Sequence, residues 1–80
     1  MIPLYGFLQG DSVGLLVLAE ESDTAADLAE KLQSAAQIRV KTEAKVKVVY
    51  HGVIIGSHTT VAQAQMGALD RFDVIQAGPR

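Results

Sequence analysis

The segment spanning residues 25–36 constrains the fold most, because it has the pattern of one amphipathic helix within a chain whose other segments are strand-like. It contains no glycine, proline or β-branched residue, and Leu28 and Leu32 form an apolar stripe with neighbouring alanines. Thr24 and Asp27 have the spacing of a capping box, which predicts that the helix begins here. The stripe must pack against another element to be buried, and we expect that element to be one face of a sheet.

Two apolar segments before the helix predict a β-hairpin. Residues 2–9 are rich in β-forming side chains and are followed at residues 10–12 by Gly-Asp-Ser, which favours a turn. Residues 13–19 form an apolar run that is too short for a typical helix and has no polar stripe. We therefore expect this run to pair with the first strand.

After the helix, residues 38–50 alternate between apolar and polar side chains. One parity carries isoleucine, valine and tyrosine, whereas the other carries Arg39, Lys41, Lys45 and Lys47, with an interruption at residues 42–44. The alternation predicts a strand with one solvated face. His51-Gly52 then predicts a tight turn into a short strand at residues 53–55.

A short helix and a last strand complete the predicted order. Thr60 and Gln63 repeat the capping-box spacing, and Gly67 is expected to end the short helix as a left-handed cap. Residues 70–75 have the pattern of a final strand, after which residues 76–80 are expected to form a flexible tail. The predicted order is therefore β-β-α-β-β-(short helix)-β.

The composition favours one folded domain and excludes several kinds of site. The 80 residues are 49% hydrophobic and 20% charged, so we expect residues 1–80 to form a single domain around one core. The chain contains no cysteine, which excludes disulfides and thiolate sites and suits the cytoplasm, the location that we expect. The longest apolar run is much shorter than the roughly 20 residues needed to cross a bilayer, so no membrane span is expected. A net charge of −2 disfavours nucleic-acid binding.

The residue types that carry chemistry are not grouped in the patterns that catalysis or metal binding requires. His51 and His58 lack cysteine partners and a compact ligand cluster, so we interpret them as exposed histidines. The serines lack a nucleophile-elbow sequence. An acidic group near the helix start could be read as a carboxylate pair but is more simply a solvated helix start; it comprises Glu20, Glu21, Asp23, Asp27 and Glu30. We expect no enzymatic activity, no cofactor and no bound metal.

The order of elements and several local segments resemble ubiquitin, whose β-grasp fold wraps a mixed sheet around a single helix. The matching segments are Ser22-Asp23-Thr24 at the helix start, residues 48–52, Thr60-Val61, and residues 69–75. The resemblance implies an α+β, ubiquitin-like domain with about five strands on one helix. These residues mark caps, a turn and core faces, so they specify architecture better than function.

Among β-grasp proteins, the chain is similar to the gamma or B subunit of bacterial toluene monooxygenases, the toluene monooxygenase system protein B family. The similarity lies in the small size, the apolar opening hairpin, and the ending from residues 60–62 to residues 73–75. It implies a small non-catalytic subunit docked on a larger hydroxylase subunit, which itself holds the di-iron centre. No iron would then be bound by this chain.

Two other functions fit the same fold. A ubiquitin-like modifier or sulfur carrier acts through a flexible tail ending in two glycines, but this chain ends Gly78-Pro79-Arg80 and has no glycine pair. A free-standing adaptor would recruit partners by adding a strand to its sheet edge, and it differs from a subunit only in whether its complex is permanent.

The predicted core follows from the helix stripe meeting one face of the sheet. We expect it to contain Leu4, Val17, Leu28, Leu32, Val48, Tyr50, Leu69 and Val74.

Two apolar residues remain once each strand is given one inward face. Val49 has the parity of Lys45 and Lys47, and Ile75 has the parity of Asp73, so both should point outward. The resemblance to ubiquitin implies that they adjoin and form a partner-binding patch, to which Lys45 and Lys47 could add an interaction with an acidic partner. The alternatives are that the tail covers one of the apolar residues, that they are isolated surface residues, and that the lysines only solvate an exposed strand.

Overall fold

The elements follow one another along the chain in the predicted order. The structure is a computed structural model that describes residues 1–9, 14–36 and 46–76. Within these ranges the elements are β1 (Ile2–Leu8), β2 (Leu15–Ala19), α1 (Ala25–Ala36), β3 (Val46–Tyr50), β4 (Val53–Ile55), α2 (Val61–Ala64) and β5 (Arg71–Gln76).

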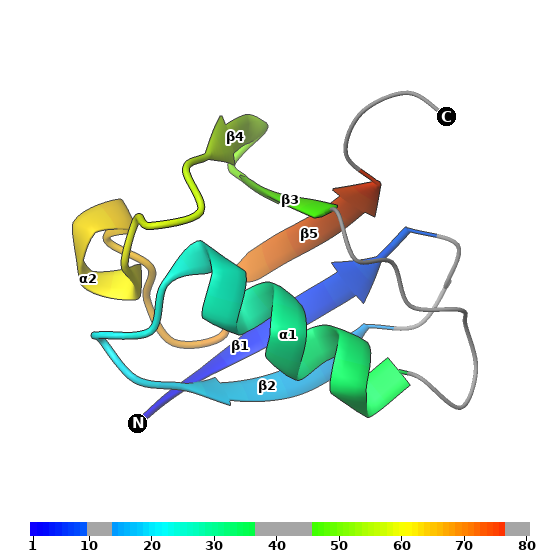
Figure 1. Ribbon diagram of the computed structural model, residues 1–80. Coiled ribbons are helices and arrows are strands. Elements are labelled where there is room, and N and C mark those ends of the chain that lie inside the picture. Colours follow the sequence, from blue (N-terminus) through cyan, green and yellow to red (C-terminus); the bar gives the residue numbers. More distant parts are fainter. Residues whose placement is uncertain (10–13, 37–45, 77–80) are drawn as a thin grey trace.

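The five strands of the described ranges form one mixed sheet with the order β2-β1-β5-β3-β4. The first and last strands, β1 and β5, are parallel neighbours at the centre, and every other neighbouring pair is antiparallel. Helix α1 lies across one face of this sheet, and the short α2 lies near one end of it (Figure 1). The mixed sheet on one helix confirms the predicted β-grasp architecture.

Reciprocal capping boxes begin both helices, as predicted. At α1, the Asp27 N–H donates to Thr24 Oγ1 (3.2 Å) and the Thr24 N–H donates to Asp27 Oδ2 (3.0 Å). At α2, the Gln63 N–H donates to Thr60 Oγ1 (3.0 Å) and the Thr60 N–H donates to Gln63 Oε1 (2.9 Å). Each box satisfies backbone donors that have no acceptor within the helix.

The predicted turn between β3 and β4 is also confirmed. His51 and Gly52 have φ values of 54° and 78°, the left-handed conformation that a two-residue type I′ hairpin loop requires at both positions. The flanking residues Tyr50 and Val53 are paired across the strands. This hairpin sets the register of β4, and therefore the direction in which its backbone groups point.

The core lies between α1 and the inner face of the sheet. Its buried residues are Leu4, Leu8, Val17, Ala19, Ala25, Leu28, Ala29, Leu32, Ala36, Val48, Tyr50, Val61, Met66, Phe72 and Val74. Gly6 permits the close approach of helix and sheet, because a Cβ atom there would lie 2.8 Å from Phe72 Cζ and 3.0 Å from both Cδ atoms of Leu32. All the predicted core residues except Leu69 are buried.

Two predictions between α2 and β5 are wrong. Leu69 is 57% exposed, because it lies in a turn before β5 with a φ of 66°, where strand alternation does not yet apply; the buried aromatic residue is Phe72. The left-handed cap of α2 is Gln65, with a φ of 60°, rather than Gly67. Since α2 ends at Ala64, the chain must reverse two residues earlier than the glycine.

Some predicted features lie outside the described residues. They are the turn at residues 10–12, the part of the alternating segment before Val46 including Lys45, and the tail from residue 77 onward.

Candidate functional site

The face of the sheet opposite α1, here called the outer face, carries most of the exposed apolar side chains of the strands. Leu4, Val48 and Val74 point toward the helix, so the alternate residues of the same strands point away from it. The outer face comprises Pro3, Tyr5, Phe7, Leu16, Leu18, Lys47, Val49, Ile54, Arg71, Asp73 and Ile75.

One half of the outer face is formed by β1 and β2. Tyr5 lies opposite Leu16, and Pro3 lies opposite Leu18. Leu16, Leu18 and Tyr5 are 55%, 52% and 42% exposed, respectively. Adjacent apolar side chains of this size, exposed together, are typical of an interaction surface rather than of scattered surface residues.

The other half is formed by β3, β4 and β5, and it contains the predicted pair Val49 and Ile75. Val49 lies opposite Asp73 on one side and Ile54 on the other, whereas Ile75 lies opposite Lys47. Val49 and Ile75 are therefore diagonal neighbours on the same face, and both are half-buried. The structure brings these two residues together with Lys47, which is exposed; Lys45 lies outside the described residues.

A charged pair occupies the centre of the outer face. Arg71 Nε donates to Asp73 Oδ1 (2.9 Å), and the Arg71 guanidinium lies 4.0 Å from the centroid of the Phe7 ring. This hydrogen bond to Asp73 raises the pKa of Arg71. The two paired side chains are partly exposed, so a charged strip lies between the two apolar halves of the face. Arginine and aromatic residues are also enriched where protein interfaces are strongest.

Among the residues of this face, the sequence predicted only Val49, Ile75 and Lys47 as partner-binding, so much of the face was missed. The signal was present in residues 15–19, where apolar residues occupy both parities. Only one parity can meet the helix, so Leu16 and Leu18 must lie on the other face. The same reasoning applies to Ile54 in β4.

The histidines predicted to be exposed are both exposed in the structure. His51 stacks on the ring of Tyr50, with 4.1 Å between the ring centroids. The Tyr50 hydroxyl donates to Asp70 Oδ2 (2.5 Å), and this bond, with a smaller contribution from burial, raises the pKa of Tyr50 to about 12. Across the described ranges, no three histidine, aspartate or glutamate side chains are grouped as a metal site would require.

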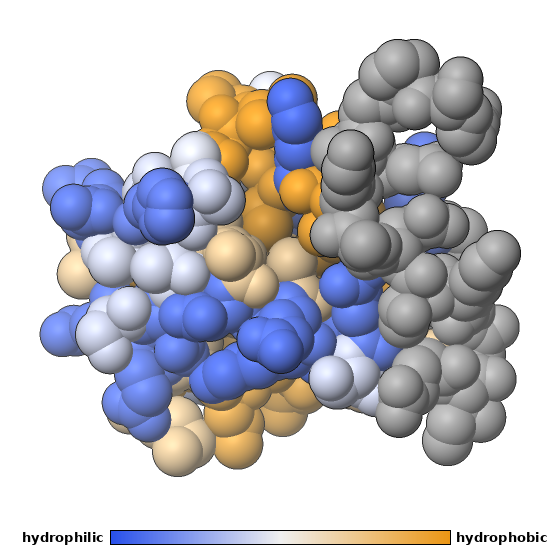
Figure 2. Space-filling model, viewed as in Figure 1, coloured by the Kyte–Doolittle hydropathy of each residue, from blue (hydrophilic) through white to orange (hydrophobic). Residues whose placement is uncertain are grey.

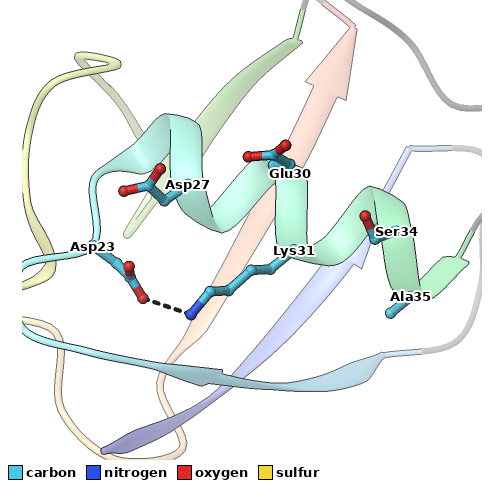
Figure 3. Close-up of a pocket in the computed structure, with 6 residues that line it drawn as sticks. All are labelled: Asp23, Asp27, Glu30, Lys31, Ser34 and Ala35. Carbon is cyan, nitrogen blue, oxygen red and sulfur yellow. Dashed lines mark hydrogen bonds and ion pairs between the residues drawn. The ribbon is translucent and has the colours of Figure 1, made fainter.

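Three residues of the acidic group, Asp23, Asp27 and Glu30, line a surface pocket with Lys31, Ser34 and Ala35 (Figure 3). Lys31 Nζ lies 2.7 Å from Asp23 Oδ2, and this hydrogen bond lowers the pKa of Asp23. Asp27 caps the helix. These two carboxylates are therefore engaged in structural contacts, which supports the interpretation of the group as a helix start.

The strand order and the single covering helix define a ubiquitin-like β-grasp domain. Its structure is similar to that of "Caldiarchaeum Subterraneum Ubiquitin", with a TM-score of 0.77 and 13% identity over 98% of this chain and 95% of that chain. It is also similar to a chain in "Crystal structure of ATBAG1 in complex with HSP70", with a TM-score of 0.77 and 12% identity over 95% of this chain and 40% of that chain.

Within this class, the chain belongs to the Toluene-4-monooxygenase system protein B (TmoB) family, whose model matches residues 1–75. A chain in "Toluene 4 monooxygenase HD Complex with Inhibitor 4-Bromobenzoate" has a TM-score of 0.87 and 20% identity, over 95% of this chain and 98% of that chain. A comparison with curated proteins gives no significant match. The family predicted from the opening hairpin and the two C-terminal segments is thus confirmed. None of the described helices is long and apolar enough to cross a membrane.

Proposed function

We propose that this chain is a non-catalytic accessory subunit of a multicomponent di-iron monooxygenase, and that it docks on a larger hydroxylase subunit through the outer face of its sheet. Membership of the protein B family supports a role within a monooxygenase system. The similar solved chain belongs to a toluene 4-monooxygenase complex, which supports a larger protein as the partner.

The observation that carries the docking proposal is the exposed apolar surface on both halves of the outer face. Val49 and Ile75, the two residues predicted from sequence parity, lie on it next to Lys47. Leu16, Leu18 and Ile54, from two other strands, are each more than half exposed on the same face. Burial of such a face would contribute roughly 25 cal/mol for each Å² of apolar surface removed from water, before the entropic cost of association.

The proposed absence of catalysis rests on how the ionisable side chains are used. Asp23, Asp27 and Asp70 each accept hydrogen bonds that hold the fold together. Asp73 is paired with Arg71 on the docking face. In this proposal the iron chemistry belongs to the larger subunit, this chain binds no metal, and the complex forms in the cytoplasm. Elemental analysis of the purified chain after dialysis tests the metal prediction, and one equivalent of iron or zinc that is lost on replacing His51 or His58 would contradict it.

The double variant Val49→Asp/Ile75→Asp tests the docking face. Co-expression with the larger hydroxylase subunit and affinity capture of that subunit should recover the parent chain but not this variant, because two carboxylates would have to be desolvated at the interface. The matched control is Ala26→Asp/Ala62→Asp, which adds the same charge at exposed positions of α1 and α2. Circular dichroism checks that all three chains are folded. Equal recovery of a folded Val49→Asp/Ile75→Asp chain would refute the proposed face.

A further inference from the structure

Strand β4 lies at one edge of the sheet and is apolar on both of its sides. Val53 and Ile54 point to opposite faces and are 61% and 54% exposed, respectively. All three residues of β4 are β-branched and uncharged. A strand that is apolar on both sides is typical of the interior of a sheet rather than of its edge.

The hairpin register determines where the backbone of β4 can form hydrogen bonds. Tyr50 and Val53 flank the two-residue loop, and they form the hydrogen-bonded pair that such a loop closes. Hydrogen-bonded and non-bonded pairs alternate along an antiparallel ladder, so the next pair, Val49 with Ile54, is non-bonded. The N–H and C=O groups of Ile54 therefore point away from β3, toward the open edge.

Within residues 1–9, 14–36 and 46–76, the opposite edge of the sheet is protected in a way that β4 is not. The Tyr5 N–H donates to Asp70 O (2.9 Å), so the backbone of Tyr5 faces β5, and its partner Leu16 directs its own backbone groups to the open side of β2. Leu18 lies two residues after Leu16 on this edge, and its carbonyl accepts a hydrogen bond from Lys31 Nζ (3.0 Å). This contact from helix α1 occupies a backbone acceptor of the β2 edge and places a charge there, which disfavours pairing with another strand because the charge would have to be buried.

Hydrophobic surface is visible at both margins of the helix side of the molecule. Figure 2 shows it over β4 at the top and over β2 at the bottom, separated by hydrophilic surface over α1. On the other side of the sheet, Ile54 is paired with Val49 and so continues the outer face to the edge. The β4 edge is thus contiguous with the proposed docking face.

We propose that β4 pairs with an extended segment of the larger hydroxylase subunit, which adds a sixth strand to the sheet. The inference rests on the proposed function and specifies how the partner binds. The added segment would exchange backbone hydrogen bonds with Ile54 and would carry uncharged, β-forming side chains on both sides, to match Val53 and Ile54. Its residue opposite Ile54 would not be proline, which lacks the N–H donor.

Amide hydrogen exchange of the ¹⁵N-labelled chain, measured by NMR alone and in the complex with the larger subunit, tests this pairing directly. The Ile54 amide should exchange rapidly in the free chain and slow by about a hundredfold or more in the complex, because it gains an acceptor. The Ser22 amide, which lies in the exposed turn before α1 and off the outer face, is the internal control and should not gain comparable protection. An Ile54 amide that exchanges equally fast in both states would overturn the inference and leave the proposed function intact.

Two substitutions separate the backbone bond from the side chain. Ile54→Ala removes the side chain but keeps the N–H, whereas Ile54→Pro also removes the N–H, at a position where no hydrogen bond within the sheet is lost. We expect Ile54→Pro to bind the larger subunit at least about tenfold more weakly than Ile54→Ala, a difference of ~1.4 kcal/mol. Equal weakening of the two folded variants would show that only the side chain docks, and would overturn the strand pairing.

Two further outcomes are distinguishable. If no complex forms with the larger subunit, the proposed function fails and this inference fails with it. If the Ile54 amide becomes protected in the isolated chain as its concentration rises, a second copy of the chain occupies the edge, which would overturn the assignment to the hydroxylase subunit.

Discussion

Replacement of Leu28 by alanine should destabilise the domain severely, because Leu28 is fully buried between α1 and the sheet. Loss of three buried carbon atoms removes ~2.4 kcal/mol at about 0.8 kcal/mol for each methylene. The cavity that remains raises the expected loss of unfolding free energy to about 2–5 kcal/mol. For a chain of 80 residues, the total unfolding free energy is roughly 4–12 kcal/mol, so this single change removes a large share of it.

Urea denaturation followed by circular dichroism measures the effect, and thermal unfolding should show a midpoint lower by about 10 °C or more. Glu30→Ala is the matched control, because Glu30 is an exposed residue of the same helix and its truncation should change the unfolding free energy by less than about 0.5 kcal/mol. A Leu28→Ala midpoint indistinguishable from that of the parent would show that α1 does not direct Leu28 into the core. The described orientation of the helix on the sheet would then be wrong.

Three other changes test separate features of the fold. Tyr50→Phe should abolish a pH dependence of the unfolding free energy. The pKa of Tyr50 is raised from 10.0 to about 12 in the folded state, so its bond to Asp70 stabilises the parent below about pH 10 and is lost as the pH rises toward 12. Urea denaturation at several alkaline pH values would detect this as a difference between the two chains. Gly6→Ala should lower the unfolding free energy by roughly 1–3 kcal/mol through overpacking, partly offset by a few tenths of a kcal/mol from a stiffer unfolded chain. A denaturation midpoint above that of the parent would contradict the close approach of helix and sheet. Thr24→Ala should cost about 1 kcal/mol by removing the acceptor for the Asp27 N–H, and an unchanged denaturation midpoint would show that this cap contributes nothing.

Local features of the sequence determined the elements and their order. The capping boxes at Thr24 and Thr60 and the turn at His51-Gly52 were all predicted, because each depends on residues that lie within three positions of one another. The outward direction of Val49 and Ile75 followed from the period of two along each strand. The left-handed residue after α2 was misplaced, because glycine is only the preferred residue for that conformation, and here Gln65 adopts it.

Which strands from distant parts of the chain become neighbours was decided only by the tertiary structure. The pairing of β1 with β5 joins segments from opposite ends of the chain, and it creates the two edges at β2 and β4. Only this arrangement shows that Lys31 reaches the Leu18 carbonyl at one edge, while at the other edge no strand of the described residues pairs with Ile54 on its outer side. Periodicity and capping act over a few residues, whereas strand neighbours and edges depend on contacts between distant segments that compete for the same helix face, and no local pattern records the outcome of that competition.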